Sequence, residues 1–328
     1  MPNDLAGEDS RIGWSGTISI ERSDNWIMPW RIPVKDRALF PEQLVERAAM
    51  PAGVKLSFVS DADWINIKCD VSNDRSPLDL FIDGKFRKTG DTVGVGEVRF
   101  DSLGSEHKVF EVWLPQYGEF RFGGLRLSEG SSLSIHESDS LPRWVTYGSS
   151  ITQCREADSP SLTWPSIVAR ARKNELTCLG YGGQCHLDPL IARVIRDRDA
   201  DLISLCLGIN IYGNASLNER TFAPGIIGFV KIIREKHLDT PVVIFSPIYS
   251  PGREESLNAV GFTLRQMRLE VKEAVNKLEK HGDKNVYYVD GLDIFNEYYA
   301  HLLPDGLHPN TEGYGIMATN IMEALRQF

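Results

Sequence analysis

Four polar segments in the second half of the chain carry residue types that could catalyse acyl transfer together. Gly148-Ser149-Ser150 supplies a hydroxyl group, and Asp305 lies three residues before the imidazole of His308. Segment 180–184, G-Y-G-G-Q, offers backbone N–H groups, and Asn210 offers a side-chain amide. Acyl transfer through a tetrahedral oxyanion needs a hydroxyl nucleophile, a histidine base, a carboxylate that orients the base, and N–H donors. Each segment alone could be an ordinary turn or helix cap, so the prediction depends on their combination.

The elements that must position these segments alternate between strand and helix patterns from Arg143 onward. Run 202–207 is mostly apolar, as expected for a strand covered on both faces. Five such units predict a parallel sheet with right-handed crossovers and helices on both faces. Sites in such sheets lie at the carboxyl ends of the strands, and each polar segment follows a predicted strand. The predicted strands are 143–147, 176–179, 202–207, 242–245 and 286–289; the predicted helices are 163–173, 189–198, 223–236, a long helix with an apolar face from Val260 to Leu278, and 311–325.

The first part of the chain, from about Ile12 to Ser140, has β patterns instead. Short apolar runs are separated by turn signals such as Asp83-Gly84, which predicts an all-β sandwich. Segment 42–50 is the one helix-like patch. Polar turn-forming residues at 129–132 and 137–140 precede a change of pattern at Leu141-Pro142. We therefore expect two domains, 1–140 and 141–328.

Tryptophans are concentrated in this first part, which holds five of the seven. They could line a concave ligand-binding face, but tryptophans more often fill the core of a sandwich, and the core interpretation is favoured. The five are Trp14, Trp26, Trp30, Trp64 and Trp113.

The polar motifs resemble those of the SGNH, or GDSL-type, esterases and acylhydrolases from about residue 143 to the C-terminus. The resemblance implies a flavodoxin-like, three-layer α/β/α hydrolase domain with a parallel sheet. The first part of the chain is similar to the jelly-roll-like β-sandwich that precedes the catalytic domain in some two-domain members. The similarity rests on the motifs P-L-D-L-F-I-D-G-K and V-W-L-P. Two positions depart from the family pattern, since Ser149 and Ile211 stand where the family often has aspartate.

Site roles follow from the resemblance, motif by motif. Y-G-S-S-I-T is similar to the nucleophile block and implies that Ser150 is the nucleophile, with its own N–H in the oxyanion hole. The motifs G-Y-G-G-Q and L-G-I-N-I are similar to the second and third conserved sequence blocks of the family. This similarity implies that the backbone N–H of Gly183 and the side-chain amide of Asn210 donate to the oxyanion. D-G-L-H-P-N is similar to the last block, which makes His308 the base and Asp305 its orienting acid. No metal or cofactor is needed for this chemistry.

Three further residues could lie near the substrate. His186 and Ser149 are candidates for lining it, although His186 could equally form part of the rim. Asp188 could lie near the pocket or cap the helix that is predicted to begin at Pro189.

Other nucleophile and carboxylate candidates are weaker. Cys154 and Cys185 follow predicted strand ends, but a better-placed serine exists, so both are interpreted as packing residues. Asp290 and Asp293 could supply an alternative carboxylate for His308, although a role in a turn is favoured.

Composition narrows the class of protein. The 328 residues carry 36 Lys and Arg against 45 Asp and Glu, a net charge of −9, which argues against nucleic acid and anionic membranes as partners. Five cysteines without a C-x-x-C pair predict neither a disulfide framework nor a structural zinc site. The first residues show no signal-peptide pattern, and no apolar run is long enough to span a bilayer. A cytoplasmic location is the resulting expectation.

The sequence therefore predicts a serine esterase that removes a short acyl group, such as acetyl, from a small-molecule or carbohydrate ester. The carbohydrate part depends on family analogy and on the preceding sandwich. Two alternatives stay open: an acyltransferase that uses the same triad, and a glycan-binding protein with a silent hydrolase domain. The oligomeric state is not indicated by the sequence.

Overall fold

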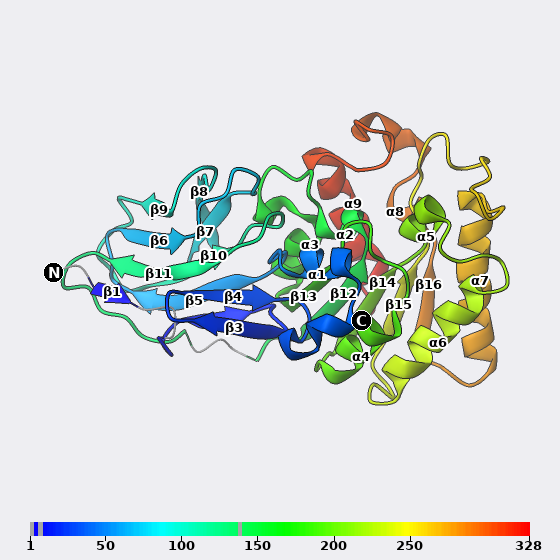
Figure 1. The fold of residues 1–328 in the computed structure, drawn as a ribbon, viewed down its shortest axis with the longest axis horizontal. Coiled ribbons are helices and arrows are strands. Elements are labelled where there is room, and N and C mark those ends of the chain that lie inside the picture. The colour runs from blue at the N-terminus through cyan, green and yellow to red at the C-terminus, as the bar shows by residue number, and fades with distance from the viewer. Residues whose placement is uncertain (1–2, 6–8, 137–139) are drawn as a thin grey trace. The chain divides into compact units, whose positions relative to one another are not determined.

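The chain divides into two compact units in a computed structural model that describes residues 3–5, 9–136 and 140–328 (Figure 1). The predicted turn residues 137–139 lie outside the described residues. Unit 1 comprises Met1–Leu141 and Asp158–Ser161, and unit 2 comprises Pro142–Ala157 and Leu162–Phe328.

Unit 1 is an antiparallel β-sandwich, which confirms the predicted class. One sheet has the strand order β3-β4-β11-β6-β9, with β1 paired to β11, and the other has the order β2-β5-β10-β7-β8. Phe58 and Phe110 stack in the core with their ring centroids 5.0 Å apart. The elements are β1 Asn3–Leu5, β2 Gly13–Ser15, β3 Ser19–Ser23, β4 Trp26–Trp30, the 3-10 helix η1 Val34–Leu39, α1 Glu42–Ala48, β5 Lys55–Ser60, β6 Ile65–Cys69, β7 Leu78–Ile82, β8 Lys85–Gly90, β9 Glu97–Phe100, β10 Lys108–Trp113 and β11 Phe122–Leu127.

The tryptophans of unit 1 are not all core residues. Trp30 and Trp113 are buried, and Trp14 packs edge-on against the core side chain of Phe122. Trp26 and Trp64 are only partly buried, and each lies beneath an arginine: the guanidinium carbon of Arg121 is 5.1 Å from the Trp26 ring and that of Arg99 is 3.9 Å from the Trp64 ring. The core interpretation is therefore wrong for Trp26 and Trp64, whose rings instead pair with cations.

A buried carboxylate joins the short segment Asp158–Ser161 to the rest of unit 1. Asp79 on β7 is fully buried, and its Oδ1 accepts a hydrogen bond of 2.6 Å from Thr89 Oγ1. Its Oδ2 accepts hydrogen bonds from Ser159 Oγ at 2.5 Å and from the N–H of Ser161 at 2.9 Å. A buried carboxylate needs such donors, because the unpaired charge would be costly.

Unit 2 contains a parallel sheet of five strands, as predicted, and their order is β13-β12-β14-β15-β16. In Figure 1 these strands run from green to orange. Helices α3 and α9 pack together, as do α4 with α6 and α6 with α7, which fits right-handed crossovers covering both faces. The elements are β12 Arg143–Gly148, α2 Ser150–Gln153, α3 Trp164–Arg172, β13 Glu175–Gly180, α4 Pro189–Asp197, β14 Leu202–Cys206, α5 Ile209–Asn214, α6 Phe222–Arg234, β15 Val242–Phe245, α7 Leu264–Lys280, β16 Val286–Val289, α8 Gly291–Ile294, the 3-10 helix η3 Glu297–Leu302 and α9 Thr311–Ala324. The 3-10 helix η2 Pro160–Leu162 is divided, since Pro160 and Ser161 belong to unit 1 and Leu162 to unit 2.

The long helix α7 begins later than its apolar pattern suggests. Thr263 and Gln266 form a capping box, in which the Thr263 hydroxyl accepts from the Gln266 N–H and the Gln266 side chain accepts from the Thr263 N–H. Gly261, at φ +84°, precedes this box. Val260 therefore lies outside the helix and is exposed, so its assignment to the apolar face was wrong.

Two strand ends allow the single-turn helix α2 to lie directly on the sheet. A Cβ at Gly148 would be 2.1 Å from Thr152 Oγ1. A Cβ at Gly180 would be 2.4 Å from the backbone N of Gln153. Both positions therefore require glycine because of close approach, and Gly180 meets unyielding backbone.

We expect Gly180→Ala to destabilise the protein by about 1–3 kcal/mol, because the added methyl group must displace α2 or β13. The free energy of unfolding from urea titration measures this. Gly228→Ala is the matched control, since Gly228 lies exposed in α6 with nothing within 4 Å of the added Cβ. This control should be neutral or stabilising by up to about 1 kcal/mol. Equal effects of the two substitutions would show that the contact with α2 is not tight.

Candidate active site

The turn from β12 into α2 separates the roles of two adjacent serines. Ser149 is the N-cap of α2, and its buried Oγ accepts the N–H of Ile151 at 3.2 Å. Ser150 is the first residue of the helix, and its Oγ lies 2.8 Å from Nε2 of His308. The structure thus brings the predicted nucleophile to the predicted base and uses the preceding serine as a cap.

The loop before α9 brings Asp305 to the other side of the imidazole ring. His308 Nδ1 is 2.6 Å from Asp305 Oδ2, and Asp305 Oδ1 accepts the backbone N–H groups of His308 at 2.7 Å and of Leu307 at 2.9 Å. Donation from Nδ1–H to the carboxylate leaves Nε2 as the acceptor for the Ser150 hydroxyl.

Asp305 is held as a carboxylate. Partial burial by itself raises its pKa, but the hydrogen bonds from the N–H of His308, from the His308 ring and from the N–H of Leu307 outweigh burial and lower the pKa to about 2. Asp305 is therefore ionised throughout the neutral range, as a group that orients an imidazole must be.

A tight turn after β13 presents Gly183. The N–H of Gln184 donates to the carbonyl of Tyr181 at 2.9 Å, and Gly183 has φ +75°, which defines a type II turn with Gly183 at the third position. The Gly182 N–H donates to Oε1 of Gln153 at 2.8 Å, so the last residue of α2 holds this turn beside the nucleophile helix.

Asn210 is oriented from the same segment. Its Oδ1 accepts the N–H of Cys185 at 3.0 Å, so Nδ2 is the end of the amide that can donate to a substrate. Within the part of the chain that the structure describes, the N–H groups of Ser150 and Gly183 and Nδ2 of Asn210 donate to no protein acceptor. All three predicted oxyanion donors are thus available to a ligand.

His186 uses both ring nitrogens within the protein. Nε2 is 2.9 Å from the carbonyl O of Gly183, and Nδ1 is 2.8 Å from Oγ of Ser216. Asn214 Nδ2 also donates to the Gly183 carbonyl, at 3.3 Å. These contacts support the glycine turn; the predicted contact of His186 with substrate stays a prediction.

Asp188 occupies the N-cap position of α4, but its side chain makes no capping hydrogen bond, so the capping interpretation is wrong. Its Oδ2 is buried without a hydrogen-bond partner among the described residues, and burial raises the pKa of this carboxyl group.

The remaining candidates have structural roles. Burial raises the pKa of the Cys154 and Cys185 thiols, which fits packing and disfavours a thiolate nucleophile. Asp290 caps α8 by accepting the N–H of Leu292 at 3.0 Å, and Asp293 lies within that short helix. The described residues contain no cluster of three or more His, Cys, Asp or Glu side chains that could hold a metal ion. They also form no helix that is long and apolar enough to cross a membrane.

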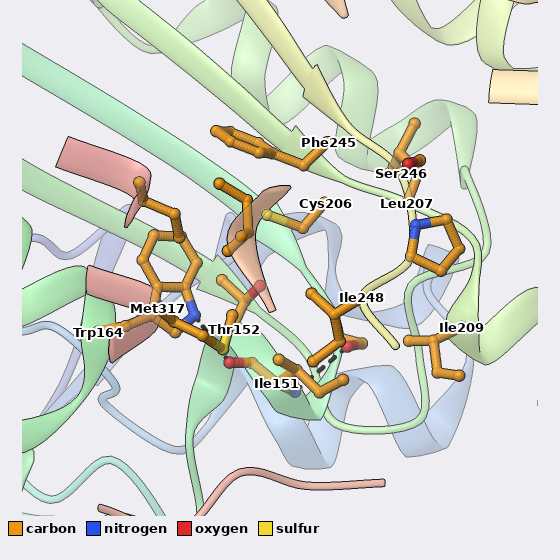
Figure 2. Close-up of a pocket in the computed structure, with 14 residues that line it drawn as sticks. Ile151, Thr152, Trp164, Cys206, Leu207, Ile209, Phe245, Ser246, Ile248 and Met317 are labelled. Atoms are coloured by element: carbon orange, nitrogen blue, oxygen red, sulfur yellow. Dashed lines mark hydrogen bonds between the residues drawn. The ribbon is translucent and has the colours of Figure 1, made fainter. Parts of the chain in front are cut away.

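A small apolar pocket lies next to the nucleophile turn (Figure 2). In the close-up, Ile151, Ile209 and Ile248 lie near one another, while Trp164 and Met317 lie on another side of the pocket. The cavity volume is about 30 Å³, where one water-sized group needs about 10–15 Å³, so it has room for two or three such groups. The lining residues are Ser149, Ile151, Thr152, Trp164, Cys206, Leu207, Ile209, Phe245, Ser246, Pro247, Ile248, Ile294, Met317 and Ile321.

The sequence did not indicate Gln153, although it is almost fully buried and joins α2 to the glycine turn. A buried glutamine must satisfy its amide group, so a glutamine that closes the motif G-S-S-I-T-Q was a usable signal.

Family comparison agrees with the two-domain fold. Residues 142–326 match the GDSL-like Lipase/Acylhydrolase family, and residues 12–122 match the SsfX3 N-terminal domain. The chain belongs to the GDSL-like lipase/acylhydrolase family and has its two-domain SGNH esterase architecture.

Solved structures extend the likeness over the whole chain. The salicylyl-acyltransferase SsfX3 from a tetracycline biosynthetic pathway is 33% identical, with a TM-score of 0.92 over 99% of this chain and 97% of that one. A putative GDSL-like lipase from Bacteroides ovatus is 22% identical (TM-score 0.83; 100% and 98% covered). A family two carbohydrate esterase from Cellvibrio japonicus is 15% identical (TM-score 0.74; 100% and 98% covered) and shares the fold. No curated protein matches the chain.

We expect Gly183→Ala to lower kcat by about 10²–10³-fold, the effect of losing one oxyanion donor. A left-handed φ costs alanine about 1–2 kcal/mol, so the substitution favours a type I turn over the type II turn. The peptide between residues 182 and 183 is flipped in a type I turn, and the N–H of residue 183 then points away from the site. Nothing lies within 4 Å of the added Cβ, so a steric clash does not contribute.

Gly261→Ala is the matched control for backbone strain. Gly261 also has a left-handed φ, +84°, and nothing lies within 4 Å of its added Cβ. It should lose similar stability in thermal unfolding and keep its kcat. A Gly183→Ala variant with unchanged kcat would remove Gly183 from the oxyanion hole.

Proposed function

We propose that the protein is a serine esterase that cleaves carboxylic esters through an acyl-Ser150 intermediate. The observation that carries the proposal is the unbroken series of contacts from Ser150 Oγ to His308 Nε2 at 2.8 Å and from His308 Nδ1 to Asp305 Oδ2 at 2.6 Å. A silent hydrolase domain is disfavoured, because all the groups that the reaction needs are present.

In the first half-reaction, Ser150 Oγ attacks the ester carbonyl carbon while His308 Nε2 takes the hydroxyl proton. The resulting oxyanion is stabilised by the N–H groups of Ser150 and Gly183 and by Nδ2 of Asn210, and one such donor is typically worth about 3–4 kcal/mol. His308 then donates its proton to the leaving alcohol. Asp305 holds the imidazole tautomer and stabilises the imidazolium.

In the second half-reaction, water attacks the acyl-enzyme. His308 takes the proton from the water molecule and the oxyanion forms again. As the intermediate collapses, the bond from the acyl carbon to Ser150 Oγ breaks, His308 returns the proton to Ser150 Oγ, and the carboxylic acid leaves. This sequence uses only groups of the protein and water.

We further propose a short acyl group, such as acetyl, on a small-molecule or carbohydrate ester. The support is the small apolar pocket, whose lining includes both neighbours of Ser150, namely Ser149 and Ile151, together with Ile209 beside Asn210. Its lining does not include Ser150, Gly183, Asn210 or His308. Structures of family two carbohydrate esterases share the fold, which makes acylated sugars a reasonable first group of substrates to assay.

The second candidate is an acyltransferase with the same triad. It is favoured by the 33% identity to the salicylyl-acyltransferase SsfX3 over 99% of the chain. Both candidates share every step up to the acyl-enzyme and differ in whether water or a hydroxyl group of an acceptor attacks it.

Ser150→Ala should lower the hydrolysis of p-nitrophenyl acetate by more than about 10³-fold, because it removes the nucleophile. Circular dichroism should show an unchanged fold, and Ser256→Ala, at an exposed serine, is the control that should keep full activity. A fluorophosphonate probe should label the wild type on the peptide that contains Ser150, as mapped by mass spectrometry. Labelling at another residue, or activity retained in Ser150→Ala, would contradict the assignment.

Product analysis with and without an acceptor alcohol separates the two candidates. For an esterase we expect free acetate to account for most turnovers of p-nitrophenyl acetate, even with glycerol or methyl glucoside present, because water reaches the acyl-enzyme. Acetylated alcohol as the main product would instead establish the acyltransferase. If the acyl chain enters the small pocket, a p-nitrophenyl ester series from two to eight carbons should show kcat/KM falling beyond about four carbons, since the pocket has room for only two or three water-sized groups. A constant kcat/KM along the series would show that the acyl chain lies elsewhere.

A further inference from the structure

We propose that Arg253 is a positioning residue of the active site, which acts through the peptide between Gly306 and Leu307 on the carboxylate of Asp305. This inference rests on the proposed function, in which Asp305 orients His308. Arg253 lies outside every motif that indicated the site, in the loop after β15.

The tight turn at 250–253 places two hydrogen-bond donors next to the carbonyl group of Gly306. The Arg253 N–H donates to the carbonyl of Ser250 at 3.1 Å, and Gly252 between them has φ +77°, which makes 250–253 a type II turn with proline at its second position. Ser250 Oγ donates to the carbonyl O of Gly306 at 2.7 Å, and Arg253 Nη1 donates to the same oxygen at 3.0 Å. Arg253 Nη1 also donates to Ser250 Oγ, at 2.9 Å.

The opposite side of that peptide bond contacts the catalytic carboxylate. The carbonyl of Gly306 and the N–H of Leu307 belong to one planar peptide unit, and this N–H donates to Asp305 Oδ1 at 2.9 Å. A cation at the carbonyl polarises the peptide, so its N–H becomes a stronger donor. The charge of Arg253 therefore acts on Asp305, and from there on His308 and Ser150 through contacts of 2.6 and 2.8 Å.

The charge of Arg253 is not neutralised by a direct ion pair. Among the residues that the structure describes, no carboxylate lies within 4.0 Å of its guanidinium nitrogens. The neighbouring acid, Glu254, instead pairs with the buried Arg268 and accepts the N–H of Ser250 at 3.1 Å. A guanidinium that donates to a carbonyl without a counter-charge keeps its full effect on that peptide.

The turn is held rigidly enough to position the loop. Ser250 is 1% exposed, and Arg268 Nη1 donates to the carbonyl of Pro247 at 3.2 Å, three residues before it. The loop it holds contains Gly306 at φ +71°, a residue type that by itself leaves the backbone free to move. Two donors on the Gly306 carbonyl remove that freedom beside Asp305.

The test compares Arg253→Met with Arg253→Lys in steady-state hydrolysis of p-nitrophenyl acetate. Arg253→Met should lower kcat about tenfold or more, toward the ~10²-fold that a misplacement of 1 Å can cost, while KM changes little. Arg253 reaches its acceptors through one nitrogen, so a lysine ammonium can replace it, and Arg253→Lys should recover most of the lost kcat. Arg265→Met, at an exposed arginine of α7, is the control and should match the wild type.

A double-mutant cycle asks whether Arg253 acts through Asp305. In the Asp305→Asn background, Arg253→Met should have less than a third of its effect in the wild type, because the group on which it acts is gone. Fully additive effects, or an Arg253→Met variant with wild-type kcat, would overturn the proposal. If Arg253→Met does not fold, Ser250→Ala takes its place in the same cycle, with a smaller expected loss of kcat and the same non-additivity.

A different measurement separates failure of this inference from failure of the proposed function. The second-order rate of fluorophosphonate labelling at Ser150 reports activation of the nucleophile without any ester substrate. If the wild type labels but hydrolyses no ester, the proposed function fails and the labelling rates of the same variants still decide the role of Arg253. Equal labelling rates for the wild type and Arg253→Met would overturn the positioning role.

Discussion

The site depends on one hydrogen bond between residues that are 158 positions apart, from Ser150 Oγ to His308 Nε2. A nucleophile and its base must be held within about 0.5 Å of their working geometry. For Ser150, the proposed nucleophile, this requirement is served by α2, which lies directly on Gly148 and Gly180 at the strand ends. His308 meets it from the loop that precedes α9, a helix that packs back against α3. The two residues are therefore placed by the sheet order and by the return of the last helix, neither of which is a local property of the chain.

Patterns that repeat along the chain allowed much of this to be predicted. Apolar strands followed by amphipathic helices indicated the parallel sheet, and turn signals between short runs indicated the sandwich. The polar motifs at strand ends selected Ser150, Gly183, Asn210, Asp305 and His308, and the structure gives these residues the contacts and free donors described above.

Features that depend on distant backbone atoms could not be predicted. The partner of Arg253 is a carbonyl group, and every residue has one, so no residue type marks the contact. Asp188 stands where a cap is expected and does not form one, and Trp26 and Trp64 follow the sandwich pattern yet lie beneath arginines. The Pro-Gly pair at 251–252 did indicate a turn, but what that turn holds is a question of tertiary structure.

The segment Asp158–Ser161 has a consequence for how this architecture can change during evolution. It belongs to unit 1 although it follows the nucleophile helix in sequence. A cut after Leu141 would remove both donors to Oδ2 of Asp79, Ser159 and Ser161, and leave only the Thr89 hydroxyl on Oδ1, which is costly for a buried carboxylate. Unit 1 is therefore not an interchangeable module that recombination could move as one continuous piece. One stretch of four residues thus completes the first unit while being encoded inside the sequence of the second.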